Sequence, residues 1–312
     1  MIARTSIALA LGLWFSAGQV QAVPLTSTEM LQQFNVVVSG NLNSTSHVDG
    51  RTYVGGDVKG GAYVQHAGRT PASKYAGLTV GGNVSGNVHV NGLGAVVGGN
   101  VKNATVNSGE SHVGGTASNS SFNGNVYVAG AASNVNFGQK IHAASYSGIN
   151  LNGKVLNATT STMNGMLVFD LTTLDSKIFS SITSDLSFNL NGASTVIFNT
   201  NDSILNLNAN FAQPHNLASS LIWNFAGASS VSVGRTFGGQ VLVPNGTFSN
   251  TGGANVEGGV YAKNLNQGGE IHLQKFTGSL PAEVPEPGTL ALLMAGAGMI
   301  AFTGRRRKLS GR

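Results

Sequence analysis

The chain has 312 residues and no cysteine, which excludes both a disulfide framework and a thiolate-ligated metal site. It also carries little charge: Asp, Glu, Lys and Arg make up 9% of the residues, against about 25% in an average soluble protein. Glycine is abundant instead, with 44 residues, together with Asn, Ser, Thr and Val. Such a surface is polar without being charged, which suits a protein that works outside the cytoplasm.

The net charge of +5 belongs to the two ends of the chain and not to its body. Residues 23–284 hold 11 basic and 11 acidic residues, so this region is neutral. The excess comes from Arg4 and from five basic residues that follow residue 304, offset by Glu286. The body has no basic face with interleaved aromatic residues, and we therefore expect no nucleic-acid binding.

The first 22 residues have the three parts of a secretory signal peptide. Arg4 supplies the positive start, Ile7 to Phe15 the short apolar run, and Val20-Gln21-Ala22 the small residues that a signal peptidase recognises. The alternative is a buried N-terminal helix, but the apolar run is short and is followed by small and polar residues. We expect export, with a mature chain that begins near Val23.

A short phrase recurs between Tyr53 and Gly130. Its copies are Val54-Gly55-Gly56-Asp57-Val58, Val80-Gly81-Gly82-Asn83-Val84, Val97-Gly98-Gly99-Asn100-Val101, Val113-Gly114-Gly115-Thr116 and the looser Gly124-Asn125-Val126-Tyr127-Val128. The leading valines of the first four copies lie 26, 17 and 16 residues apart. Self-similarity at a nearly fixed period indicates stacked repeats.

Each copy predicts a strand, a sharp corner and another strand. Valine favours a pleated, half-buried surface, whereas Gly and Asn enter left-handed backbone conformations more readily than other residues. A period of about 16 residues fits one coil of a β-solenoid with three short faces, and stacking of coils buries their apolar sides. We therefore predict a mainly β protein, a right-handed parallel β-helix with one amphipathic helix packed alongside. A sandwich of short antiparallel strands is the alternative.

Two helices are predicted outside the repeats. Thr26 and Glu29 form a capping box for a short helix that ends near Phe34, before a first rung at Val36–Gly40. A longer amphipathic helix is predicted over residues 171–186, lying against the solenoid. Its apolar stripe consists of Leu171, Leu174, Ile178, Ile182 and Leu186.

Further rungs are predicted on both sides of that helix. They lie at 135–138, 149–153, 194–199, 204–208, 220–225, 230–233, 239–246 and 256–265, and residues 269–272 end the stack. Trp223 and Phe225 are interpreted as core and not as a sugar-stacking platform. Residues 65–71, which include Gly68 and Pro71, predict an excursion from one coil, either a passive insertion or a binding loop.

The motifs at both ends of the repeat region resemble the choice-of-anchor A family. They are Phe34-Asn35-Val36-Val37-Val38-Ser39-Gly40-Asn41, the Val-Gly-Gly repeats, Gly239-Gln240-Val241-Leu242-Val243-Pro244-Asn245-Gly246 and Val256-Glu257-Gly258-Gly259-Val260-Tyr261-Ala262-Lys263-Asn264-Leu265. The likeness covers roughly residues 25–276. It implies a bacterial surface adhesion domain with an ice-binding-like β-helix and a helix packed alongside, and we assign this domain to residues 23–280.

The tail, residues 281–312, has three parts in a fixed order. Pro285-Glu286-Pro287 is followed by an apolar span, residues 289–304, and by the basic cluster Arg305-Arg306-Arg307-Lys308. The strictly apolar stretch from Leu290 to Phe302 would be about 20 Å long as a helix, which is short for a hydrocarbon core of about 30 Å. The basic cluster is expected to stay cytoplasmic. An ordinary C-terminal membrane anchor is the alternative.

This arrangement resembles the PEP-CTERM sorting signal. The resemblance implies recognition by an exosortase-type membrane enzyme, processing near the motif, and a Gram-negative host that makes exopolysaccharide. The inner membrane would hold the protein before processing, and the cell surface or extracellular matrix would receive it afterwards.

Candidate catalytic groups are few and scattered. The histidines are His47, His66, His89, His112, His142, His215 and His272, and no two have the spacing of a helical zinc site. His89 and His112 could stack on one face, or be solvent-facing rungs. Four acids could include a carboxylate pair for polysaccharide cleavage: Asp49, Asp57, Glu110 and Asp170. Asp49 and Asp57 could also bind calcium at corners, although the sequence has no acidic nonapeptide repeat. We expect no catalytic, cofactor or metal site.

These observations predict an exported, non-enzymatic surface or matrix protein that binds exopolysaccharide or another surface ligand. One alternative is an extracellular β-helix enzyme that acts on polysaccharide, because such folds host lyases and hydrolases. Another is an ice-binding protein, which would need a regular threonine array. Threonines such as Thr52, Thr79, Thr105 and Thr116 do not form a sustained one.

Overall fold

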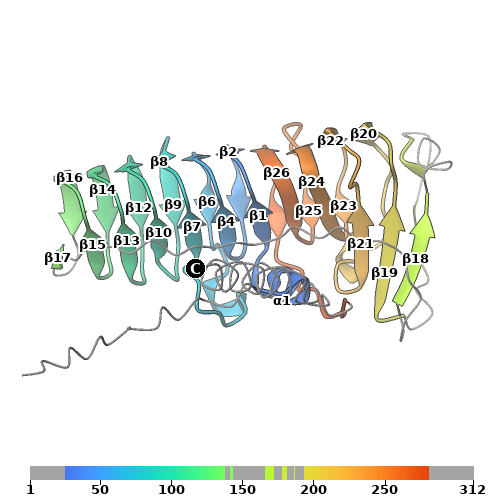
Figure 1. Cartoon of the computed structure of the whole chain (residues 1–312), viewed down its shortest axis with the longest axis horizontal. Coiled ribbons are helices and arrows are strands. Elements are labelled where there is room, and N and C mark those ends of the chain that lie inside the picture. Colours follow the sequence, from blue (N-terminus) through green and yellow to red (C-terminus); the bar gives the residue numbers. More distant parts are fainter. Residues whose placement is uncertain are drawn as a thin grey trace, which may run out of the picture.

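The computed structural model describes residues 25–137, 141–142, 166–171, 178–180, 186 and 193–280. The predicted signal peptide (1–22), the rung expected at 149–153 and the whole tail (281–312) lie outside these residues. Within them the chain forms one short α-helix and a long stack of parallel strands (Figure 1).

The strands fall into two arms. The first arm contains β1 (Val36–Val38), β2 (Leu42–Ser44), β3 (His47–Val48), β4 (Thr52–Val54), β5 (Val58–Lys59), β6 (Ala62–Tyr63), β7 (Leu78–Val80), β8 (Val84–Ser85), β9 (Val88–Val90), β10 (Ala95–Val97), β11 (Val101–Lys102), β12 (Ala104–Val106), β13 (Ser111–Val113), β14 (Ala117–Phe122), β15 (Val126–Val128), β16 (Ala132–Phe137) and β17 (Ile141–His142). The second arm contains β18 (Met166–Asp170), β19 (Thr195–Asn199), β20 (Ile204–Leu207), β21 (Leu221–Asn224), β22 (Ser230–Val233), β23 (Phe237–Gly238), β24 (Gln240–Ser249), β25 (Val256–Glu257), β26 (Val260–Gln267) and β27 (Ile271–His272).

Every strand pairing among the described residues is parallel, which confirms the β-helix and excludes the antiparallel sandwich. Three ladders run along the rod. Ladder 1 follows the order β17-β15-β13-β10-β7-β4-β1-β26-β24-β21-β19-β18. Ladder 2 follows β16-β14-β11-β8-β5-β2-β26-β24-β22-β20. Ladder 3 follows β16-β14-β12-β9-β6-β3-β27-β25-β23.

The order of the strands in space differs from their order in the sequence. The first strand, β1, lies in the middle of the rod, and the first arm winds outward from it to β17 (Figure 1). The second arm has β18 at the opposite end and winds back until its last rung meets the first. Val36 consequently pairs with Thr52 on one side and with Val260 on the other. A seam between residues more than 200 positions apart therefore lies in the centre of the sheet.

The corner between ladders 1 and 2 explains the repeated phrase. At four of these corners, the Asn or Asp that follows a Gly-Gly pair, or Ser39-Gly40 in the first coil, accepts through its side-chain oxygen a hydrogen bond from the backbone N–H of the equivalent residue in the next coil. Asn41, Asp57, Asn83 and Asn100 each do so, at 2.7–2.9 Å. The glycines are needed because adjacent corners approach closely: a Cβ on Gly98 would lie 2.5 Å from the carbonyl oxygen of Gly81.

The interior is a single apolar cluster that runs through both arms. In the first arm it consists mainly of valines, such as Val84 and Val101. In the second arm it contains large rings, and Trp223 and Phe225 are both completely buried, as predicted. Burial of these side chains supplies the main stabilisation of the stack.

The helix that packs alongside the solenoid is α1 (Ser27–Gln33). Its capping box is confirmed: Glu29 N–H donates to Thr26 Oγ1 (3.2 Å), and Thr26 N–H donates to Glu29 Oε2 (2.8 Å). α1 lies across the middle rungs (Figure 1) and buries Met30 and Leu31 in a second apolar cluster. That cluster covers outward-facing residues of ladder 1, among them Tyr261.

The continuous helix predicted over residues 171–186 is not formed. Most of this range lies outside the described residues, but both of its ends bond to strands. Leu171 N–H donates to the Asn199 carbonyl, and Leu186 forms a parallel bridge with Phe211. Ile178 is helical but Ser180 is not. Leu171 and Ile178 pack against the apolar interior, and within the described residues α1 is the helix that packs alongside the solenoid.

The predicted excursion lies between β6 and β7 and includes a 3₁₀ turn at Ala67–Arg69. The buried side chain of Arg51 fastens it to the helix end, because Nη1 donates to the carbonyls of Gln33 (3.0 Å) and Pro71 (2.9 Å) and Nε donates to that of Tyr75 (3.0 Å). A buried guanidinium with these partners holds the loop against the solenoid, which favours the structural interpretation of this insertion.

Candidate functional site

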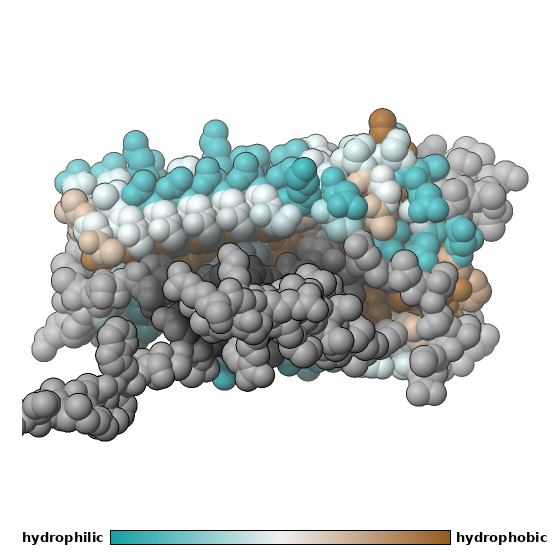
Figure 2. Space-filling view, viewed as in Figure 1, coloured by the Kyte–Doolittle hydropathy of each residue, from teal (hydrophilic) through white to brown (hydrophobic). Residues whose placement is uncertain are grey.

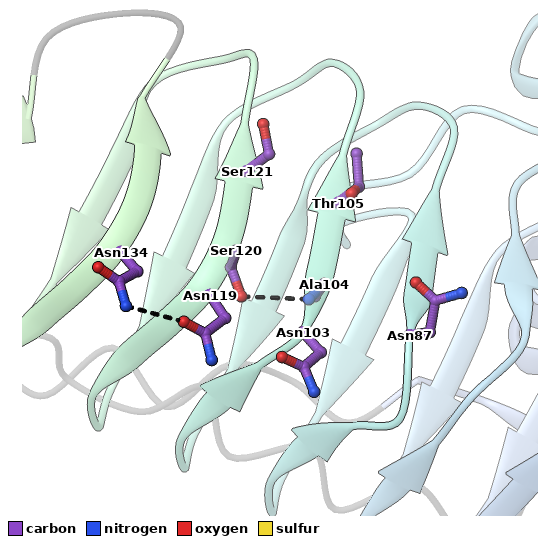
Figure 3. A pocket seen from close by; sticks show the side chains of 8 residues that line it. All are labelled: Asn87, Asn103, Ala104, Thr105, Asn119, Ser120, Ser121 and Asn134. Atoms are coloured by element: carbon purple, nitrogen blue, oxygen red, sulfur yellow. Dashed lines mark hydrogen bonds between the residues drawn. The ribbon is translucent and has the colours of Figure 1, made fainter.

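A row of asparagines marks the corner between ladders 2 and 3, which we call the amide corner. It comprises Asn87, Asn103, Asn119 and Asn134, one from each of four successive coils (Figure 3). All four have left-handed backbones, with φ between 47° and 65°. Asn tolerates this conformation, so the residue that makes the corner also presents an amide there.

The amide corner lines a shallow groove of about 560 Å³. Ala104, Thr105, Ser120 and Ser121 complete its lining, so it contains no charged side chain. Asn134 Nδ2 donates to Asn119 Oδ1 (3.2 Å), and Ser120 Oγ accepts from Ala104 N–H (3.1 Å). Four uncharged rungs therefore present amides and hydroxyls side by side.

A second groove, of about 610 Å³, continues along the same corner toward the seam. Its lining comprises Asn43, Ser44, Thr45, Lys59, Gly60, Gly86, Thr251, Asn266, Gln267 and Gly268. Gly86 directly precedes Asn87, so the two grooves meet there. Figure 2 shows hydrophilic residues gathered along the upper edge of the rod, where Figure 1 places β2, β8 and β14.

A different arrangement, an acid–histidine chain, occupies the seam. Glu257 is 2% exposed and contacts His272 Nδ1 (2.6 Å) and His215 Nδ1 (2.7 Å). Glu270 contacts His272 Nε2 (2.6 Å) and His47 Nε2 (3.2 Å). His47 lies on the first rung and His272 on the last, so this chain joins the two arms.

The charges of the acid–histidine chain are coupled. The hydrogen bond with Glu257 raises the pKa of His272 to about 9, against the opposing effect of burial, and Glu270 adds to the rise. Burial alone would raise the pKa of Glu257, but the hydrogen bond and charge of His272, with the charge of His215, lower it. At neutral pH an imidazolium is therefore held between two carboxylates. This arrangement occupies the carboxylate oxygens and serves as a structural clasp.

Of the two alternatives for His89 and His112, stacking on one face is not what the structure shows. His89 lies on ladder 3 between Ala62 and Thr105, whereas His112 lies on ladder 1 and stacks on Tyr127 with ring centroids 4.6 Å apart. The register of the coils places them on different faces, which their spacing in the sequence does not reveal.

The four candidate carboxylates are not brought together. Asp49 is buried and accepts from Leu273 N–H (3.0 Å), Asp57 belongs to the Gly-Gly corner, and Glu110 contacts His112 (2.7 Å). Asp170 ends β18 at the far end of the second arm. Within the described part of the chain, no group of three or more His, Asp or Glu side chains could hold a metal ion.

Sequence reasoning named His47, His215 and His272 but missed Glu257 and Glu270, which bind them. The alternation of Glu270 and His272 was the available signal. Their partner His47 lies 223 residues from Glu270, and only closure of the seam brings it near. The four named threonines are also dispersed: Thr52 and Thr79 are buried on ladder 1, Thr105 lies on ladder 3, and Thr116 lies at a corner.

The described strands thus form a parallel β-helix, a β-solenoid with uncharged polar side chains along one corner. Residues 27–273 match the family described as "Putative Ice-binding-like adhesive domain". The match covers most of the chain, which therefore belongs to this family of adhesive domains. The choice-of-anchor A designation fits this family and stays a prediction. No curated protein and no solved structure matches the chain.

Residues 283–308 match the PEP-CTERM protein-sorting motif, which confirms the second resemblance. The protein is therefore an exported surface or extracellular protein that an exosortase-type enzyme recognises. The sorting residues Pro285, Glu286 and Pro287 and the basic cluster 305–308 lie outside the described residues. Among the residues that the structure describes, no helix is both long and apolar enough to cross a membrane.

Proposed function

We propose that the protein is a non-enzymatic adhesin or structural component of the extracellular matrix. The observation that carries this proposal is the pairing of an adhesive-family β-helix with a surface-sorting motif in one chain. The rod is polar, nearly free of charge on its grooved corner, and elongated, which suits contact with an extended ligand. The carboxylates of Glu257 and Glu270 contact histidines, and that of Asp49 accepts a backbone hydrogen bond.

The route to the surface is part of the proposal. The signal peptide (1–22) directs export of the adhesive domain (23–280), and the apolar span (289–304) holds the chain transiently in the inner membrane. The cluster Arg305–Lys308 keeps that end cytoplasmic. An exosortase-type enzyme then cleaves near Pro285–Pro287 and releases the domain to the cell surface or matrix.

A triple variant in the producing cells tests the route. Replacing Pro285, Glu286 and Pro287 by alanine should leave the intact chain in the inner-membrane fraction, whereas Pro281→Ala should be processed normally. Fractionation with mass spectrometry of the C-terminus provides the measurement. Normal processing of the triple variant would contradict the proposed sorting.

Deletion of the protein tests the adhesive role. Cells that lack it should lose attachment or matrix cohesion, and expression of the unaltered chain should restore them. Release of oligosaccharides from the host's own polymer by the purified protein would instead favour the polysaccharide-acting enzyme. Unchanged attachment and matrix composition after deletion would count against the adhesin and the matrix component alike.

A further inference from the structure

The amide corner holds polar groups that are exposed and have no partner. Among the described residues, the side chains of Asn87 and Asn103 form no hydrogen bond, and neither do the hydroxyls of Thr105 and Ser121. Asn87 and Asn103 are exposed, and the two hydroxyl residues are half-buried beside them. These groups can therefore donate to and accept from a ligand without breaking an internal bond.

The backbone that carries these groups is held in place before any ligand arrives. Each asparagine sits at a left-handed corner whose backbone is held by neighbouring ladders; for example, Asn103 N–H donates to the Ser118 carbonyl (3.2 Å). Two side-chain torsions are then all that an amide loses on binding. Preorganisation of this kind lowers the entropic cost of binding and favours specific recognition.

The chemistry of the groove selects against charged and apolar partners. Its eight lining residues include no acid, base or aromatic ring. A nucleic acid would require basic side chains, and a protein partner would require an apolar centre. Amides and hydroxyls that both donate and accept match a ligand with the same property at every unit, namely a chain of neutral, hydroxylated sugars.

The shape of the corner matches a linear ligand. The groups repeat once per coil, and the strands of neighbouring coils lie about 4.8 Å apart. The second groove extends the path through Gly86, Gly60 and Thr45 to Gly268 and Thr251 beyond the seam. Eight coils therefore offer a straight path of roughly 34 Å. A pyranose chain repeats its hydroxyls over a comparable distance per sugar.

We propose that the amide corner binds one chain of a neutral polysaccharide lengthwise along the rod, through the amides of Asn87, Asn103 and Asn119 and the hydroxyls of Thr105 and Ser121. The proposal rests on the proposed adhesive function and assigns its ligand class and contact surface. Lys59 and Lys102 flank the path on ladder 2 and are exposed, so an anionic polysaccharide is the competing ligand.

Glycine substitution tests the amides without disturbing the corner, because glycine adopts positive φ freely. The exported protein, purified from the producing cells, would be run in affinity gels that contain dextran or soluble glucomannan, and in parallel gels with alginate. The variant Asn103→Gly/Asn119→Gly should bind the neutral polymers about tenfold more weakly than the unaltered protein. Gln213→Gly, an exposed amide at φ 54° outside the groove, is the matched control and should bind normally.

A second variant covers the case in which the first one unfolds. Thr105→Val/Ser121→Ala leaves the left-handed positions intact and should weaken binding of the same neutral polymers by several-fold. Circular dichroism and thermal melting of each variant establish that the fold is kept.

Three results would overturn the assignment: no retardation of the unaltered protein by any neutral polymer, normal binding by both groove variants, or binding of alginate alone that Lys59→Ala/Lys102→Ala abolishes. Inhibition of ice recrystallisation that depends on Asn103 and Asn119, without polysaccharide binding, would also overturn it. If attachment of the cells still depends on the protein while the groove variants behave normally, the adhesive function stands and only this ligand assignment fails.

Discussion

The two arms of the β-helix fill the same kind of interior in different ways. The first arm uses small residues at a short period: equivalent corner residues lie 16 or 17 positions apart, as in Asn83, Asn100 and Thr116. In the second arm, paired residues of β19 and β21 lie 25 positions apart, as in Asn199 and Asn224, and those of β20 and β22 lie 26 positions apart. Longer coils enclose a wider interior, which valines alone cannot fill.

Aromatic rings occupy that wider interior. Trp223 has ring centroids of Phe179, Phe198, Phe211 and Phe237 within 5.8 Å, and its indole N–H donates to the Gly238 carbonyl (2.8 Å). The first arm instead gains its cohesion from backbone pairing and from a hydrogen bond at every Gly-Gly corner. The stability of the narrow first arm therefore depends on close backbone approach, whereas that of the wide second arm depends on its central side chains.

Truncation of the central ring should have the largest effect. Trp223→Ala should lower the free energy of unfolding by about 3–5 kcal/mol, because it removes a fully buried ring and leaves a cavity. Val101→Ala in the first arm should cost only about 2 kcal/mol. Urea unfolding followed by circular dichroism measures both. Equal losses would show that the two interiors are not packed differently.

A methyl group at a Gly-Gly corner tests the first arm. Gly98→Ala should destabilise the protein by about 1–3 kcal/mol, since its Cβ would meet the Gly81 carbonyl oxygen. Gly252→Ala is the control, because nothing lies within 4 Å of a Cβ there, and its effect should stay within about 0.5 kcal/mol. If the two substitutions were equally mild, close backbone approach would not limit the first arm.

Titration of His272 tests the clasp that joins the arms. Its pKa in the folded protein is raised from 6.5 to about 9, so its contribution is complete below pH 6.5 and is lost as the pH rises through 9. We expect the free energy of unfolding to fall by on the order of 2 kcal/mol between pH 6 and pH 10. The lowered pKa of Glu257 adds stability that is lost as the pH falls below about 4.5.

Two variants test whether the loss of stability at alkaline pH originates at the seam. His272→Gln should be less stable at pH 7 and should lose most of the decline between pH 6 and pH 10. His112→Gln, which alters a half-exposed histidine–glutamate contact within the first arm, should keep that decline. An unaltered decline in His272→Gln would place the titrating group elsewhere.

The smallest effect is expected from loss of a single side-chain hydrogen bond at the corner between ladders 1 and 2. Asn100→Ala removes the side-chain oxygen that accepts from Thr116 N–H (2.8 Å) and should cost about 1 kcal/mol. Asn107→Ala removes only an exposed contact with Asn91 Oδ1 and should cost less than about 0.5 kcal/mol. Thermal unfolding of the two variants side by side gives the difference. Identical melting temperatures would mean that this side-chain hydrogen bond adds no stability beyond that of the backbone hydrogen bonds.

The sequence predicted the parts of the fold whose cause is local. The Val-Gly-Gly repeats specified short strands and tight corners because both preferences belong to individual residues, and the capping box of α1 needs only Thr26 and Glu29. The expectation of a continuous helix over 171–186 was wrong at its described ends, because Leu171 and Leu186 bond to Asn199 and Phe211 of the second arm. Apolar spacing alone does not reveal such pairings.

By itself, the sequence determined a neutral, cysteine-free stack of coils and a C-terminal sorting motif, since composition, corner residues and linear motifs act over short distances. Only the tertiary structure decided where the stack begins. The return of the second arm to the first rung places His47 beside Glu270 and leaves His89 and His112 on separate faces. It also continues the amide corner across the seam. These outcomes depend on strand register between residues more than 200 positions apart, and no local preference encodes that register.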